Sequence, residues 1–402
     1  MQPPRSSASP LAGVTVVDLT RLIPGPLAAR LLKDLGARVI KIEEPTLGDP
    51  ARQAPPARGG RGALATLLLS GLESVALDLK RPAARQVLAA LLEEADVLLS
   101  SFRPGTLARL GLGQEEVTRR FPRLVVCSLT GFGETGPLAP RAGHDLTYQA
   151  LAGALAATGS TPALPVADVA GAWSVVASVL AALYGRERSG RGSFIDASLY
   201  DAAWHANLCA WVAEAGGPQP LGRRLPLSGA LPCYDLYPTA DGRTVAVALL
   251  EAPFWRRFCR CLGRPDLRRR RFSSDPAVRR ELAAELVRRS SEELERWAEE
   301  EDLPLAVART AAEARALPQA RARGLRLEGG DGLPRLAYPA RFDGERPGGE
   351  GELPALGSAT ESVLAELAAA GRLPPLRLDR ASGVGRRFSW QRWLRRLLGA
   401  PH

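Results

Sequence analysis

The chain has 402 residues, carries a formal charge of +10, and is 46% hydrophobic and 24% charged. Single hydrophobic cores stop growing at about 250–300 residues, so this length predicts two domains. All but three of the 53 basic residues are arginine, a bias typical of GC-rich coding sequence. The basic residues are dispersed and are not interleaved with aromatic residues, so we expect no nucleic-acid partner. A positive surface still attracts anionic ligands.

The first half of the chain alternates short strands with helices. The expected strands are 14–20, 38–43, 75–79, 96–100 and 123–129, and the expected helices are 27–36 and 82–94. This alternation predicts a mostly parallel α/β sheet of Rossmann-like type. The first strand is followed by P24-G-P26 instead of G-x-G-x-x-G, and proline lacks the N–H donors of a pyrophosphate cradle. The pattern therefore disfavours a nicotinamide or flavin cofactor.

The second half predicts a smaller α+β domain. Residues 150–185 are alanine-rich and helical around a loop at 159–168, with Asp168 expected at a helix N-cap. A strand at 193–198 and a helix at 200–213 follow, and a linker covers 216–232. The expected elements of the small domain are a D-G hairpin at 234–250 and helices at 253–262, 276–289 and 291–300. A second linker covers 341–357, and a basic amphipathic helix is expected at 388–398.

Cysteine usage and the sequence of the N-terminus indicate the cellular compartment of the protein. Cys259 and Cys261 form a C-x-C pair without a second pair, a poor zinc signal, so we expect no metal. The leader at 1–10 is expected to be disordered and has no apolar segment behind it. The longest apolar stretch, 173–184, is too short to span a bilayer. We expect a soluble, cytoplasmic protein with no membrane insertion.

Seven landmarks, in register along the chain, resemble a known family. They are TRLIPGP (20–26), DLGARVIKIEEP (34–45), SVALDLK (74–80), FRPGTLARLGLG (102–113), SLTGFGETGP (128–137), GRERSGRGSFIDASL (185–199) and LGSATESVLAEL (356–367). Together they resemble the family III CoA-transferases, the CaiB/BaiF superfamily, which includes formyl-CoA and carnitine-CoA transferases and the α-methylacyl-CoA racemases. The resemblance extends from about residue 11 to residue 368.

The resemblance implies a domain plan and an assembly. A large Rossmann-like α/β domain would comprise residues 11–215 and a return segment at 321–368, with a small α+β domain at 225–320 and a tail at 369–402. Two chains would thread through each other as an interlocked homodimer, with the active site between large and small domains.

Two motifs, AGHDLTY (142–148) and LLEAPFW (249–255), match the racemase branch. By that pattern His144 and Asp168 are the acid/base pair, Glu251 is hydrogen-bonded to His144, and Asp145 assists from the other side. The implied reaction is racemisation or epimerisation of 2-methyl-branched acyl-CoA thioesters in lipid metabolism. One base removes the α-proton and the other delivers a proton to the opposite face. No cofactor is implied, because coenzyme A enters as part of the substrate.

The positions matching the family's CoA-binding residues are Lys41, Leu77, Asp78, Leu79, Lys80, Phe102, Arg103 and Arg109. Many relatives carry a basic run where this chain reads LSGLE (69–73), and arginine where it has Glu44. These departures imply weaker binding of 3′-phosphorylated adenosine unless arginines such as Arg58 or Arg61 compensate.

Two alternatives stay open. The chain is alternatively a CoA-transferase that moves CoA between carboxylic acids through an intermediate on Asp168. A further alternative is a degenerate family member without turnover, in which His144, Asp168 and Glu251 have structural roles only.

Overall fold

The computed structural model describes residues 9–156, 161–217, 225–328, 333–348 and 351–373. The chain divides into two compact units, a large one of 1–148, 165–206 and 321–402 and a small one of 149–164 and 207–320. Residues 149–164 and 207–215, which we had assigned to the large domain, therefore belong to the small unit. The helix expected at 388–398 and most of the expected leader lie outside the described residues.

The large unit is built on a six-stranded sheet in which all neighbouring strands are parallel. Its order is β5-β2-β1-β6-β7-β8, with bounds β1 Thr15–Leu19, β2 Arg38–Glu43, β5 Glu73–Ala76, β6 Val97–Ser100, β7 Val125–Thr130 and β8 Phe194–Ser198. The winding direction reverses between β1 and β6, which is the doubly wound arrangement. The predicted parallel α/β sheet is confirmed.

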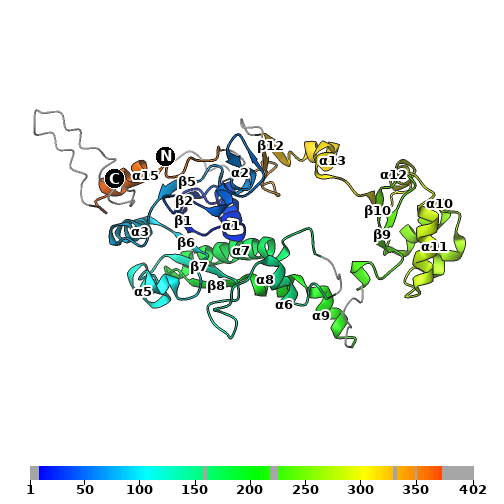
Figure 1. Ribbon diagram of the computed structural model, residues 1–402, viewed down its shortest axis with the longest axis horizontal. Helices are drawn as coiled ribbons and strands as arrows, with labels where there is room; N and C mark the ends of the chain where they lie inside the picture. The colour runs from blue at the N-terminus through cyan, green and yellow to red at the C-terminus, as the bar shows by residue number, and fades with distance from the viewer. Residues whose placement is uncertain (1–8, 157–160, 218–224, 329–332, 349–350, 374–402) are drawn as a thin grey trace, which may run out of the picture. The chain divides into compact units, whose positions relative to one another are not determined.

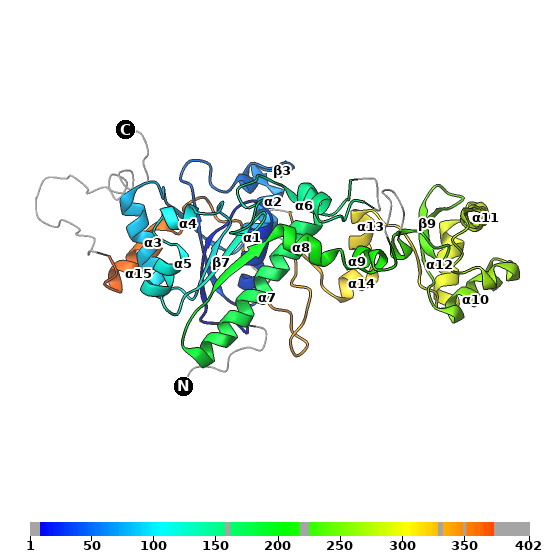
Figure 2. The ribbon, with the colours of Figure 1, turned by 90° about the horizontal axis from the view of Figure 1, so that it is seen from below.

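Helices cover both faces of this sheet (Figures 1 and 2). On one face α1 (Pro24–Asp34) packs against α7 (Val166–Ser189), which also contacts β7 and β8. On the other, α3 (Pro82–Glu94), α5 (Gln114–Arg120) and α15 (Thr360–Ala369) share one apolar core with the strands. The amide of Ala76 donates to Thr360 Oγ1 at 3.0 Å, which ties α15 to β5. The chain thus returns to the large unit after the small one.

Short elements connect these layers. They are η1 (Pro50–Arg52), β3 (Ala57–Arg58), β4 (Arg61–Gly62), α2 (Ala63–Leu69), α4 (Thr106–Arg109), α6 (Asp145–Leu151), α8 (Leu199–Ala206), α14 (Pro318–Ala322), β12 (Arg326–Glu328) and β13 (Pro334–Leu336). Of these, α4 follows β6 and α6 follows β7, so both lie after the carboxyl ends of sheet strands, where ligands bind in this class of fold.

The small unit has a three-stranded antiparallel sheet in the order β11-β10-β9. Its elements are α9 (Leu208–Glu214), η2 (Pro226–Ser228), β9 (Tyr234–Pro238), β10 (Thr244–Ala248), α10 (Ala252–Cys261), η3 (Pro265–Arg269), α11 (Pro276–Leu286), α12 (Ser291–Glu300), β11 (Leu305–Val307) and α13 (Ala311–Ala316). The expected hairpin and three helices are present. Trp255, fully buried in the core, donates its indole N–H to the carbonyl of Leu267 at 2.9 Å.

The structure corrects three expectations. The helix expected at 200–213 is two helices, broken at Asn207, whose amide group donates to the carbonyl of Ala152. Strand β5 ends at Ala76 rather than at residue 79, and the residues from Leu77 to Lys80 line a cavity. Asp168 is not an N-cap: α7 begins at Val166, so the carboxyl lies within the first turn.

Helix α7 also differs from the expectation for its apolar stretch. The helix extends beyond the apolar stretch to 24 residues, and by length and composition alone it is long and apolar enough to cross a membrane. Its packing against α1, β7 and β8 is that of a covering helix of an α/β sheet. Near its end the side chain of Arg186 is buried and pairs with Asp96 at 2.9 Å.

Candidate functional site

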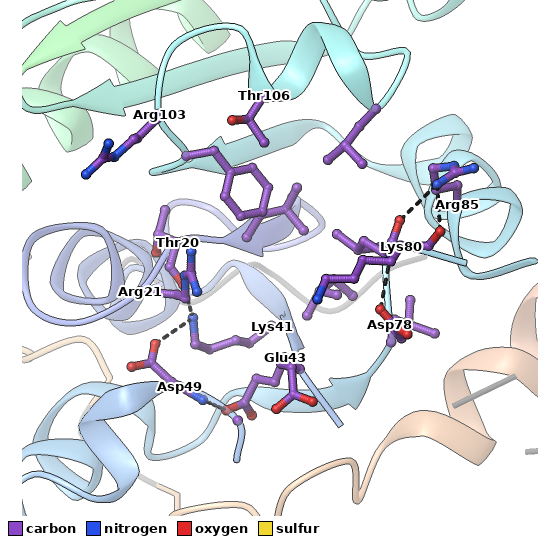
Figure 3. A pocket seen from close by; sticks show the side chains of 18 of the residues that line it. Thr20, Arg21, Lys41, Glu43, Asp49, Asp78, Lys80, Arg85, Arg103 and Thr106 are labelled. Carbon is purple, nitrogen blue, oxygen red and sulfur yellow. Dashed lines mark hydrogen bonds and ion pairs between the residues drawn. The ribbon is translucent and has the colours of Figure 1, made fainter. Parts of the chain in front are cut away.

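A cavity of about 560 Å³ opens at the carboxyl ends of four adjacent strands, β5, β2, β1 and β6. All eight residues matched to CoA binding line it, namely Lys41, Leu77, Asp78, Leu79, Lys80, Phe102, Arg103 and Arg109. Further lining residues that the sequence analysis did not propose as ligands include Thr20, Arg21, Glu43, Asp49, Arg85 and Thr106 (Figure 3). The eight matched positions were proposed from the resemblance to the family, and the sheet brings them to one cavity.

Lys41 forms part of the cavity wall, and its charge is matched from within the protein (Figure 3). Its ammonium donates to Asp18 at 3.1 Å and to the carbonyl of Thr20 at 2.7 Å, and it pairs with Asp49 at 3.3 Å. Burial lowers the pKa of Lys41, but the charges of Asp18 and Asp49 outweigh this and raise it. Lys41 is therefore a permanent cation that is already neutralised by carboxylates.

Glu43 supports the same wall. Arg52 donates two hydrogen bonds to its carboxylate, at 2.8 and 2.7 Å, and Ser74 donates a third at 2.6 Å. Burial alone would raise the pKa of Glu43, but these bonds lower it, so the side chain stays ionised and fixed. Such an internal network gives the cavity a rigid base before any ligand binds.

The remaining cations lie at the rim. Arg103 is exposed at one end, and Lys80 and Arg85 lie at the other (Figure 3). Between them Phe102 contributes an aromatic wall, and the guanidinium of Arg21 is 5.8 Å from its ring centroid. An apolar middle with cations at both ends suits an elongated, anionic ligand.

A second group of polar side chains lies in the same unit, where α6 and α7 begin. His144 directly precedes α6, and its carbonyl accepts the N–H of Thr147 at 2.8 Å. Asp145 is the first residue of α6, and its carboxylate accepts the backbone N–H of Asp168 at 3.1 Å. His144, Asp145 and Asp168, distant in sequence, are therefore brought to one place.

The carboxyl of Asp168 is electrostatically unusual. Burial, together with the charge of Asp145, raises its pKa from 3.8 to about 6, while His144 acts in the opposite direction. A helix N-terminus favours the anionic form of a carboxyl, but at Asp168 desolvation and the neighbouring carboxylate outweigh that effect. A carboxyl titrating near neutral pH is suited to general acid–base chemistry.

Tyr148, on α6, is a further residue near this group that was not among the predicted site residues. Its buried ring packs edge-on against Phe132, with centroids 5.1 Å apart. A Cβ added at Gly143 would lie 2.5 Å from its Cε1 atom, so that glycine is needed for the ring to fit. Burial and the charge of Asp168 raise the pKa of Tyr148, and Arg103 opposes this. The helical spacing of four from His144 is the signal that could have found it.

Other predicted residues have different surroundings. Glu251 lies in the small unit, where its exposed side chain precedes α10 and makes no capping hydrogen bond. Arg58 and Arg61 lie on the β3–β4 hairpin and do not line the cavity, and Arg61 pairs with Glu352 at 3.5 Å. The segment 69–73 leads from α2 to β5 and is also absent from the lining. Within the described ranges, no three His, Cys, Asp or Glu side chains gather as metal ligands would.

A doubly wound sheet with a cavity beyond its carboxyl ends is the architecture of the α/β nucleotide-binding enzymes. The profile of the CoA-transferase family III matches residues 11–360, and the chain belongs to that family. It is 31% identical to the acetyl-CoA:oxalate CoA-transferase of Acetobacter aceti over 86% of this chain and 93% of that protein. It is 36% identical to human α-methylacyl-CoA racemase over 63% of this chain and 65% of that one. A CaiB/BaiF family protein from Brucella suis has a similar structure, with a TM-score of 0.79 and 29% identity over 90% of this chain and all of the other.

Proposed function

We propose that this chain catalyses 1,1-proton transfer at the α-carbon of 2-methyl-branched acyl-CoA thioesters, seen as racemisation or epimerisation. The observation that carries the proposal is the grouping of His144 with Asp168, whose pKa is raised to about 6. A carboxyl whose pKa is raised to about 6, next to an imidazole in the chain fold, suits a reaction in which one group accepts a proton and the other donates one.

In this proposal the carboxylate of Asp168 removes the α-proton from one face of the carbon. Protonated His144 delivers a proton to the opposite face, so the net charge of the pair is unchanged. In the next turnover the two groups exchange their roles as acid and base. The intervening enolate places negative charge on the thioester oxygen, which needs a hydrogen-bond donor. We assign this role to the hydroxyl of Tyr148, which stays protonated because burial raises its pKa.

The nucleotide part of the thioester is assigned to the cavity lined by Lys80, Phe102 and Arg103. The partnership of Glu251 with His144, the roles of Asp145 and the other cavity residues, the interlocked homodimer, the cytoplasmic location and the link to lipid metabolism stay predictions.

CoA transfer between carboxylic acids is the second candidate. The relative named as an acetyl-CoA:oxalate CoA-transferase matches 86% of this chain, more than the 63% matched by the human racemase. In that reaction the carboxylate of Asp168 attacks the thioester carbonyl, CoA leaves as the thiolate, and a mixed anhydride forms on the side chain. Hydroxylamine would trap this acylated carboxyl, and turnover would require an acceptor acid.

The experiment that separates the two candidates is deuterium exchange. The full-length protein is incubated in D₂O with a single enantiomer of a 2-methylacyl-CoA and no acceptor acid, and deuterium at the α-carbon is followed by NMR. We expect exchange with the wild-type protein, reduced about 100-fold or more by His144→Gln or Asp168→Asn, since general acid–base groups contribute about 10²–10⁴-fold.

His205→Gln is the matched control, because His205 is an exposed histidine on α8 that we place outside the site. It is expected to exchange at the wild-type rate. Absence of exchange with the wild-type protein would exclude proton transfer, and turnover that begins only when an acceptor acid is added would establish CoA transfer in its place.

A further inference from the structure

The two ends of the cavity are chemically different, and this gives a bound thioester a direction. Arg103, at one end, follows β6, and the neighbouring strand β7 leads to α6 with Tyr148, whose pKa is raised most by burial, raised further by Asp168 and lowered by Arg103. Lys80 and Arg85 lie at the opposite end (Figure 3). A thioester whose α-carbon reaches Asp168 therefore extends its nucleotide toward Lys80.

The cationic charge available at that nucleotide end is small. The guanidinium of Arg85 donates to the carbonyls of Leu79 and Lys80, at 3.2 and 3.0 Å. Asp78, also in the lining, adds a negative charge, and its carboxylate accepts the amide of Lys80 at 3.1 Å and pairs with Arg81 at 3.3 Å. Arg109, another cation of the lining, donates to the hydroxyl of Thr106 at 2.8 Å. On the loop after β5, the ammonium of Lys80 is the positive charge left to meet a phosphate.

Glu44 opposes that charge from across the rim. Its carboxylate accepts the amides of Thr46 at 2.9 Å and Leu47 at 2.8 Å, so the side chain is held in place while lining the cavity. The bond from Leu47, the bonds from Thr46 and the charge of Lys80 lower the pKa of Glu44, although desolvation acts slightly against them. Glu44 is therefore an anion held at the cavity wall by two backbone amides, and its charge interacts with that of Lys80.

The geometry points to Glu44 as a specificity-determining residue. Its negative charge cancels the gain in affinity that a 3′-phosphate on the nucleotide of the substrate would otherwise give. A phosphate monoester carries about two negative charges near neutral pH, so it needs several cations to repay its desolvation. Here it would meet Lys80 already opposed by Glu44 and Asp78. The cavity should therefore bind dephospho-CoA and CoA with similar affinity. This inference rests on the proposed function, since it needs a CoA-type thioester in the cavity.

Calorimetry on the full-length protein tests the inference with CoA and dephospho-CoA as probes. We expect the two dissociation constants to agree within about threefold for the wild-type protein. Glu44→Gln, which keeps an oxygen for the turn amides, should tighten CoA about three- to tenfold and leave dephospho-CoA within twofold. Glu44→Arg should tighten CoA further. Glu187→Arg, a charge reversal at an exposed position on α7, is the control for net charge and should change neither.

The outcomes separate the two proposals. If the wild-type protein binds both probes but prefers CoA more than tenfold, or if Glu44→Gln tightens both equally, the role of Glu44 is refuted and the proposed function stands. If neither probe binds at millimolar concentration, the assignment of the cavity to CoA fails, and this inference fails with it.

Discussion

Replacing Asp168 with asparagine should stabilise the protein in a pH-dependent way. The folded protein raises the pKa of this carboxyl from 3.8 to about 6, so between these values the folded state binds more protons than the unfolded state. Folding stability then falls as the pH rises through this window, opposite to the usual aspartate case. The penalty for ionising Asp168 is fully present above about pH 6 and absent below 3.8, and the neutral amide of asparagine avoids it.

The size of the effect follows from the shift. About two pKa units at about 1.36 kcal/mol each correspond to about 3 kcal/mol. The side chain of Asp168 is only partly buried, and the first turn of α7 favours its anion, so solvent screening and the helix dipole reduce the expected gain to about 1–2 kcal/mol at pH 8. At pH 4.5 the linkage relation leaves about a third of this gain.

Urea unfolding of the full-length protein, followed by circular dichroism at pH 4.5, 6 and 8, measures the difference. Glu187→Gln, which neutralises an exposed carboxyl on the same helix, should change stability by less than about 0.5 kcal/mol at every pH. A gain for Asp168→Asn that is equal at pH 4.5 and 8 would show that shape, not charge, is responsible. A loss of stability at pH 8 would refute the raised pKa.

Three further results are expected. Lys41→Met should destabilise the protein by about 3–5 kcal/mol in urea unfolding, because it leaves buried carboxylates such as Asp18 without their cation; a change below 1 kcal/mol would contradict this. Gly143→Ala should cost about 1–3 kcal/mol and lower α-proton exchange, since its Cβ would lie 2.5 Å from the ring of Tyr148; wild-type stability would show that the ring is free to move. The rate of α-proton exchange should rise as the pH passes through about 6, where Asp168 becomes a base, and a flat profile from pH 5 to 7 would exclude it as that base.

The alternation of strands and helices made the large sheet predictable. Buried β-branched runs such as Thr15–Leu19 and Val125–Thr130 are bounded by turns, and parallel order follows from the helices between them. The residues that line the cavity were proposed from the resemblance to the family, and the sheet explains why they meet, because residues after strand ends share one edge of a parallel sheet. The boundaries of helices and strands were less predictable. The break between α8 and α9 at Asn207 coincides with a hydrogen bond to the distant carbonyl of Ala152, which local sequence does not encode.

The electrostatics of the site could not be read from the sequence. A position near a helix N-terminus favours an anionic carboxylate, whereas burial and Asp145 raise the pKa of Asp168. Similarly, Lys41 matched a CoA-binding position of the family, and only the fold reveals that Asp18 and Asp49 already pair with its ammonium. Charge in a sequence is local, whereas its partners are set by tertiary structure.

Asp145 has two effects on Asp168 through one carboxylate. It accepts the backbone N–H of Asp168, which positions the first turn of α7 against α6, and its negative charge raises the pKa of the Asp168 side chain. The position of Asp168 and its pKa are therefore coupled. A movement that lengthened its hydrogen bond to Asp145 would also weaken the effect of the Asp145 charge on its pKa. Burial is the largest cause of the raised pKa, so such a movement would remove only the part that Asp145 contributes. In the proposed reaction this coupling would favour proton removal in the geometry in which His144 faces the same carbon.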